Sequence, residues 1–119
     1  MHEDLDSVHY FDLSTIGRKS GNAHSVELSF VKKDNFIFIL AHTSPQKKYP
    51  DWVHNLKAHP QCTITADGKD YPAKLAKVDD SSMFDWVKSA IIEKYGQGFY
   101  DTWYAASERI VVTLEVIDN

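Results

Sequence analysis

The sequence has a single cysteine, Cys62, and no apolar run long enough to cross a membrane as a helix. One cysteine excludes an intrachain disulfide and a cysteine-based zinc site. Cys62 lies in an apolar strand pattern, which predicts a small buried hydrophobic side chain. The first residues, Met1 to Asp4, are acidic and polar, unlike a secretory signal, so the expected compartment is the cytoplasm.

Acidic residues outnumber basic residues in this chain. Its 119 residues include 13 Lys and Arg against 17 Asp and Glu, a net charge of −4. Such a chain is poorly suited to non-specific nucleic-acid binding, which depends on neutralising phosphates. The length predicts one domain over residues 1–119, and the hydrophobic content of 43% is ordinary for a globular protein. A local cluster of cations is therefore more informative here than in a basic protein.

The spacings of common metal, hydrolytic and nucleotide sites are missing as well. Six histidines are present, but His54 and His59 are five residues apart on one predicted helix and do not share a face. No carboxylate stands at a ligand spacing from them, so no metal site is predicted. The sequence has no Gly-x-Ser-x-Gly nucleophile motif and no Walker or Rossmann glycine loop. If the protein is an enzyme, its reactive group is expected to come from a cofactor.

What the sequence does contain is a pair of cations between two glycines, in Gly17-Arg18-Lys19-Ser20-Gly21. Glycine permits close approach of the backbone to a ligand, and the N–H groups of such turns bind anions. Arg and Lys add charge-assisted hydrogen bonds. A second segment, Lys48 to Pro60, opens a predicted helix at Pro50, whose first N–H groups also favour an anion. The turn alone is typical of a soluble hairpin, but the two segments together favour an anion-binding site.

Hydrophobic patterning predicts an α+β protein with a mostly antiparallel sheet. The apolar run Phe36 to Ala41 indicates a strand covered on both faces, as in a barrel wall or a dimer interface. Asp79, Asp80 and Ser81 are expected to cap a following helix that ends at Gly96. The segment 96–107 is expected to be irregular. Strands are predicted over 9–16, 25–33, 36–41, 63–65, 71–78 and 109–117, and helices over 50–59 and about 82–95.

The two motifs, in this order and separation, resemble those of the deazaflavin-dependent nitroreductases and F420H(2)-dependent quinone reductases, within the FMN-binding split-barrel superfamily. The resemblance runs from about Thr15 to Val116. It implies a split β-barrel of about six strands with two or three helices. It also implies hydride transfer from reduced coenzyme F420 to a quinone, nitro compound or similar flat acceptor, with FMN as the alternative cofactor. Split barrels of this kind commonly build their cleft between two subunits, so a homodimer is compatible with the sequence.

The resemblance also assigns roles to individual residues. Ser44 and Tyr100 match positions that would donate a proton or a hydrogen bond to the acceptor, and Trp103 matches a position that lines the acceptor side. Ordinary core packing explains Trp52 equally well and is favoured for Tyr100 and Trp103, and Asn55 could also cap a turn. The matching cofactor-binding positions are Arg18, Lys19, Ser20, Ala41, His42, Thr43, Lys48, Trp52 and Asn55.

The chain departs from the family pattern at two places near the expected anion site. Asn22-Ala23-His24 follows Gly21 where relatives often carry another Arg, and Glu27-Leu28 replaces a common Pro-Leu. Less positive charge disfavours a long acidic cofactor tail and brings FMN, with its single phosphate, into competition. Two alternatives to the reductase therefore stay open: a carrier or sensor that binds FMN or another apolar ligand without turnover, and a barrel that acts only through its dimer interface.

Overall fold

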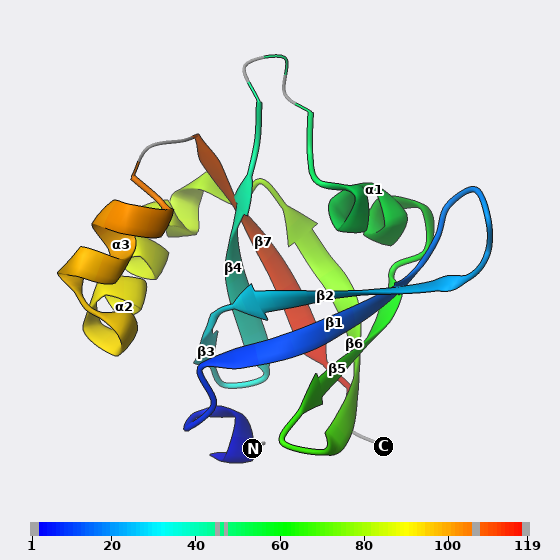
Figure 1. Ribbon diagram of the computed structural model, residues 1–119, viewed down its shortest axis with the longest axis horizontal. Coiled ribbons are helices and arrows are strands. Elements are labelled where there is room, and N and C mark those ends of the chain that lie inside the picture. Colours follow the sequence, from blue (N-terminus) through cyan, green and yellow to red (C-terminus); the bar gives the residue numbers. More distant parts are fainter. Residues whose placement is uncertain (1–2, 45, 47, 106–107, 118–119) are drawn as a thin grey trace.

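In the computed structural model, which describes residues 3–44, 46, 48–105 and 108–117, the chain forms one curled antiparallel sheet with helices at its sides (Figure 1). Seven strands in these residues pair in the order β2-β1-β5-β6-β7-β4-β3. The strands are β1 (Tyr10–Ile16), β2 (Ala23–Ser29), β3 (Val31–Lys33), β4 (Phe36–His42), β5 (Gln61–Ala66), β6 (Lys69–Val78) and β7 (Arg109–Val116). The helices are α1 (Asp51–Ala58), α2 (Phe84–Tyr95) and α3 (Gln97–Trp103), with single 3-10 turns η1 (Glu3–Leu5) and η2 (Ser81–Met83).

The two edge strands of the sheet, β2 and β3, are consecutive in the chain and meet at Phe30. A sheet whose first and last strands are joined by one residue has to curl, and the result is the split barrel that the resemblance implied. Phe30 is fully buried inside this barrel, where its ring lies 4.6 Å from that of Phe11. The corner at Phe30 thus holds the two edges of the sheet together.

Two hydrophobic cores lie on opposite faces of β4. Ile37, Ile39 and Ala41 point into the barrel, whereas Phe38 and Leu40 pack against α2 and α3. The prediction of a strand covered on both faces is therefore confirmed, and this chain itself supplies both covers. α1 closes another part of the barrel, with Val53 and Leu56 fully buried. No helix of the described residues is long and apolar enough to span a membrane.

The structure corrects three sequence predictions. The strand expected over 25–33 is two strands, because Phe30 turns the chain from one sheet edge to the other while the hydrophobic alternation continues through it. The segment 96–107 is not irregular throughout, since α3 occupies Gln97–Trp103; residues 106–107 lie outside the described residues. Asp80 precedes η2 without a side-chain cap hydrogen bond, and Met83 stands at the α2 N-cap position.

Other local predictions are confirmed. Asp67 and Gly68 form the two-residue turn between β5 and β6. Gly96 ends α2 with φ of 103°, a conformation that favours glycine, and the chain enters α3 directly after it. Cys62 is buried, at 8% exposure.

Candidate functional site

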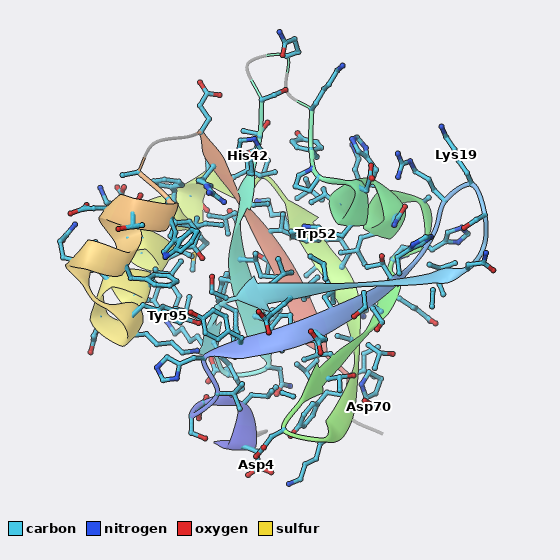
Figure 2. The ribbon with its side chains drawn as sticks, in the orientation of Figure 1. Asp4, Lys19, His42, Trp52, Asp70 and Tyr95 are labelled. Atoms are coloured by element: carbon cyan, nitrogen blue, oxygen red, sulfur yellow. The ribbon has the colours of Figure 1, made fainter. Side chains whose placement is uncertain are left out.

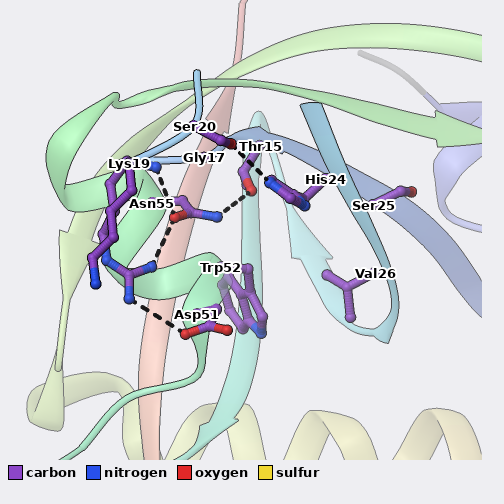
Figure 3. Close-up of a pocket in the computed structure, with 11 residues that line it drawn as sticks. Thr15, Gly17, Lys19, Ser20, His24, Ser25, Val26, Asp51, Trp52 and Asn55 are labelled. Atoms are coloured by element: carbon purple, nitrogen blue, oxygen red, sulfur yellow. Dashed lines mark hydrogen bonds and ion pairs between the residues drawn. The ribbon is translucent and has the colours of Figure 1, made fainter. Parts of the chain in front are cut away.

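The two sequence motifs meet at one cavity of about 510 Å³, here called the turn cavity. The turn between β1 and β2 forms one wall and the first turns of α1 form another (Figure 3). The segments are more than thirty residues apart in the chain, so only the fold brings them together. The cavity is lined by Thr15, Gly17, Arg18, Lys19, Ser20, His24, Ser25, Val26, Asp51, Trp52 and Asn55.

Asn55 is the residue that joins the two motifs. Its side chain is 4% exposed, and its Oδ1 accepts hydrogen bonds from the backbone N of Arg18 at 3.2 Å and from Arg18 Nη1 at 2.9 Å. Its Nδ2 donates to Thr15 Oγ1 at 3.2 Å. Because a backbone N–H can only donate, these bonds fix the orientation of the amide. Asn55 therefore fixes the β1–β2 turn against α1.

The remaining Arg18 contact is an ion pair across the same junction. Arg18 Nη2 lies 3.4 Å from Asp51 Oδ1, in the first turn of α1. The Asp51 side chain is 89% exposed and that of Arg18 is 33% exposed. The guanidinium is thus held between α1 and the turn, and much of its hydrogen-bonding capacity is already used within the protein.

Lys19 is placed differently. It points outward from the β1–β2 turn (Figure 2), and no hydrogen bond or ion pair joins its side chain to another described residue. A cation on a wall of the cavity without a partner carboxylate is available to an anionic ligand.

Gly17, Ser20 and His24 pack tightly at the base of the turn. His24 Nε2 lies 3.3 Å from Ser20 Oγ, which accepts a hydrogen bond from the backbone N of Asn22 at 3.2 Å. A Cβ at position 17 would come within 2.6 Å of Ser20 Oγ and 2.7 Å of His24 Nε2. Glycine at position 17 therefore allows the hydroxyl and the imidazole to line the cavity.

Trp52 belongs to both the core and the cavity. It is 8% exposed and packs in the barrel core, yet its ring also lines the turn cavity near Val26 of β2. The two sequence interpretations of this residue are therefore compatible.

A second hollow of about 390 Å³, the β2–α3 cavity, follows along the same strand. Ser25 and Val26 line the turn cavity, and Glu27, Leu28 and Ser29 line this one. Glu27 is therefore not on the wall of the turn cavity, where the only carboxylate among the described lining residues is Asp51. The opposite wall of the β2–α3 cavity carries Phe99, Trp103, Tyr104 and Arg109, and Trp103 is 64% exposed.

A third hollow of about 440 Å³ contains Tyr100 and Thr43 together with Asp79 and Glu108. Tyr104 and Arg109 line this cavity and the β2–α3 cavity, so they form the wall between them. Tyr100 is 7% exposed and lies in the helix-side core, and it does not line the β2–α3 cavity with Trp103. The structure therefore does not bring these two predicted residues to the same cavity.

Four other predicted positions, Ala41, His42, Ser44 and Lys48, line none of these three cavities. Ala41 is buried in the barrel core, and His42 is exposed at the end of β4. Ser44 accepts a hydrogen bond at Oγ from the backbone N of Lys48 at 3.1 Å, and the Ser44 N donates to the Lys48 carbonyl at 3.1 Å. These contacts close the loop between β4 and α1.

Arg109 is a cavity residue that the sequence analysis treated only as the start of a strand. Its Nη1 donates to the Leu40 carbonyl at 3.3 Å, its Nη2 donates to the Trp103 carbonyl at 2.6 Å, and its guanidinium lies 4.8 Å from the Tyr104 ring centre. Burial lowers its pKa, and its Nε has no hydrogen-bond partner among the described residues. An arginine directly before an apolar strand is the signal that could have drawn attention to it.

No group of three or more His, Cys, Asp or Glu among the described residues is arranged to hold a metal ion. The features of this surface with chemical character are the cation of Lys19 on the turn cavity and the aromatic residues of the β2–α3 cavity.

Comparison with known proteins identifies related sequences and folds. The sequence model of the F420H(2)-dependent quinone reductase family matches residues 3–115. A search of curated proteins found no match.

Solved structures with the same fold include an F420-H2 dependent reductase, 22% identical, with 92% of this chain and 94% of the other covered and a TM-score of 0.60. An F420 reductase is 14% identical, with 98% and 93% covered and a TM-score of 0.68. A third structure, described as a domain-swapped dimer, is 21% identical, with 92% and 80% covered and a TM-score of 0.64. At these identities the structures establish the shared fold alone.

Proposed function

The chain belongs to the F420H(2)-dependent quinone reductase family and is thus an oxidoreductase that uses coenzyme F420; from this premise we propose that it reduces a quinone, a nitro compound or a similar flat acceptor by hydride transfer. Reduced F420, when bound, supplies the hydride. The part left to this chain is to bind the cofactor and the acceptor, orient them and keep water away from the reacting atoms.

The residues of the turn cavity fit the anionic part of such a cofactor. Lys19 offers a cation without a carboxylate partner among the described residues, and Ser20 and His24 offer polar side chains made accessible by Gly17. Trp52 offers a flat surface on the same cavity. We propose that these residues hold the cofactor, and that Asn55 keeps Arg18 and the turn in place. The observation that carries this proposal is the junction of both motifs through Asn55.

We further propose that the β2–α3 cavity receives the acceptor. It lies next to the turn cavity along β2, and Phe99, Trp103 and Tyr104 give it an aromatic wall suited to a flat molecule. Its volume of about 390 Å³ is in the range of small-molecule sites. Arg109 would act as a positioning residue, since it joins the α3 end to β4.

The roles of Ser44 and Tyr100 as donors to the acceptor stay predictions. Tyr104 is better placed for contact with the β2–α3 cavity, because it lines this cavity and its hydroxyl is hydrogen-bonded to Ser29 Oγ. Steady-state kinetics of Tyr100→Phe and Tyr104→Phe distinguish the two: we expect a larger loss of kcat/KM in Tyr104→Phe.

The experiment that tests the cofactor site is a fluorescence titration of the purified protein with oxidised F420, with FMN beside it. We expect Lys19→Ala to weaken F420 binding about 10- to 100-fold, because a charge-assisted hydrogen bond contributes about 1.5–3 kcal/mol. Lys77→Ala, which removes a surface lysine outside the three cavities, is the control and should bind as the wild type does. Equal affinities for all three proteins would remove Lys19 from the site. Tight FMN binding with no F420 binding would make FMN the cofactor, and the carrier alternative would then be tested by whether the protein oxidises the reduced cofactor when an acceptor is added.

A homodimer is a separate proposal, and the structural neighbour described as a domain-swapped dimer is consistent with it. The apolar strand β4 does not require a second subunit, because the barrel core and the α2–α3 pair cover both of its faces. Sedimentation equilibrium measures the mass directly, and a mass of 13.6 kDa at micromolar concentration would exclude a stable dimer.

A further inference from the structure

We propose that Asp51 limits the negative charge of the ligand that the turn cavity accepts, so that the protein favours a cofactor with a short acidic tail over one with a long polyglutamate tail. This inference rests on the proposed binding of F420 in this cavity. Asp51 would set the specificity of binding and would take no part in hydride transfer.

The charges on the cavity wall are few and partly compensated. Arg18 and Lys19 are the cations and Asp51 is the carboxylate among the described lining residues, so with His24 neutral the wall carries a formal charge of +1. Arg18 is engaged through Asn55 and Asp51. One uncompensated cation matches one phosphate or a short tail better than a series of carboxylates.

The position of Asp51 makes its charge effective against a ligand. It stands in the first turn of α1, an eight-residue helix whose N-terminal N–H groups would otherwise attract an anion. Its side chain is 89% exposed, and its Oδ1 lies 3.4 Å from Nη2 of Arg18, one of the two cations on the cavity wall. The Asp51 carboxylate therefore already pairs with Arg18, where a second anionic group of a ligand could otherwise bind.

The expected size of the effect follows from Coulomb's law. Two unit charges about 4 Å apart in water interact by about 1 kcal/mol, which corresponds to about fivefold in a dissociation constant. Salt screens charges at an exposed site, so the effect should be largest at low ionic strength. At about 0.1 M salt the Debye length is about 10 Å, so under that condition carboxylates farther along the tail should add little and the penalty should come mainly from the first added glutamates.

The test is a set of fluorescence titrations with F420 carrying one glutamate and F420 carrying five or more, at pH 8 and low salt. The measured quantity is the ratio of the two dissociation constants. For the wild type we expect the short-tail form to bind more tightly than the long-tail form, and tighter binding of the long tail would overturn the inference. Asp51→Asn should shift the ratio about fivefold in favour of the long tail, whereas Asp51→Glu should keep the wild-type ratio.

Asp85→Asn is the matched control, because Asp85 also stands exposed in the first turn of a helix, α2, but lines none of the three cavities. It should leave the ratio unchanged. Asp51→Asn also frees Arg18 from its ion pair, so a shift in the ratio measures the whole effect of this carboxylate, its own charge and its pairing with Arg18 together. A ratio that Asp51→Asn does not change overturns the inference and leaves the reductase proposal standing. A wild-type protein that binds neither form overturns the reductase proposal, and this inference with it.

Discussion

Gly17 shows how one residue without a side chain can shape a binding site. Alanine there would press its Cβ against Ser20 Oγ and His24 Nε2. Both side chains are exposed and can move, so we expect Gly17→Ala to lower the free energy of unfolding by only about 0.5 kcal/mol. Their displacement should weaken F420 binding about tenfold. Gly98→Ala in α3, where a Cβ meets open space, is the control for titration and urea unfolding; equal binding by both variants would contradict this role of Gly17.

Cys62 is a single buried thiol on β5. Burial raises its pKa to about 12, and thiolates, not thiols, react with disulfide reagents. We therefore expect the folded protein at pH 8 to react slowly with such a reagent, and one thiol per chain to react at once after unfolding in guanidinium. Cys62→Ala gives the reagent blank. Rapid stoichiometric labelling of the native protein would show that β5 is more accessible than the structure indicates.

At the scale of secondary structure, α2 stabilises the corner between β2 and β3 through Tyr95. The Tyr95 hydroxyl accepts a hydrogen bond from the backbone N of Phe30 at 3.0 Å and also contacts the carbonyls of Phe30 and His9. Tyr95→Phe leaves a part-buried N–H without this acceptor, which should cost about 1–3 kcal/mol of stability. Tyr10→Phe, at an exposed position, should change stability by less than about 0.5 kcal/mol. Urea unfolding of both variants measures the difference, and equal midpoints would remove Tyr95 from this role.

Lys94 also contacts the corner at Phe30, and its contribution to stability should depend on pH. Its Nζ donates to the Phe30 carbonyl at 3.0 Å and lies 3.7 Å from the Phe30 ring centre. Burial lowers its pKa from the usual 10.5 to about 8, and the nearby charge of Asp6 opposes this shift. Between these two pH values the unfolded chain binds more protons at this position than the folded chain does. The Lys94 contribution to the free energy of unfolding should therefore rise with pH from about 8 to 10.5 and be least favourable at pH 7.

Lys94→Met isolates this contribution. The Phe30 carbonyl keeps its contact with the Tyr95 hydroxyl, so the variant should fold. We expect the stability of the wild type relative to Lys94→Met to increase between pH 7 and pH 10 in urea unfolding experiments. Parallel pH profiles for the two proteins would show that Lys94 keeps its ordinary pKa in the folded state.

The corner at Phe30 is an example of a structural feature that the sequence does not predict. Val26, Leu28 and Phe30 alternate with polar residues in an unbroken pattern, so the sequence predicts one strand where the chain changes its pairing partner at Phe30. α3 was missed because seven residues that include Gly98 carry little helical signal. By contrast, the continuous apolar run of β4 and the stop at Gly96 depend on local residues, and both were predicted correctly.

At the scale of the whole molecule, the site residues that the sequence predicts are those that lie in the two motifs. The sequence named Arg18, Lys19, Trp52 and Asn55, and the fold brings them to one cavity. The sequence could not place Asp51 on that wall, nor show that Tyr100 and Trp103 line different cavities, because these relations depend on contacts between distant segments. Whether the assembled residues bind F420 as proposed stays a prediction for the titrations.

The position of β7 makes the fold depend on the end of the chain. β7 lies between β6 and β4 in the sheet and contributes to both hydrophobic cores. Without it, β4 and β3 would have no partner that joins them to the other strands, and the barrel could not close. We expect deletion of residues 109–119 to abolish the cooperative unfolding transition seen by circular dichroism, whereas deletion of 118–119, which leaves β7 (Arg109–Val116) whole, should retain it. A cooperative transition in the chain that lacks residues 109–119 would mean that the remaining six strands form a stable barrel without β7. The central position of β7 in the sheet would then not be required for folding.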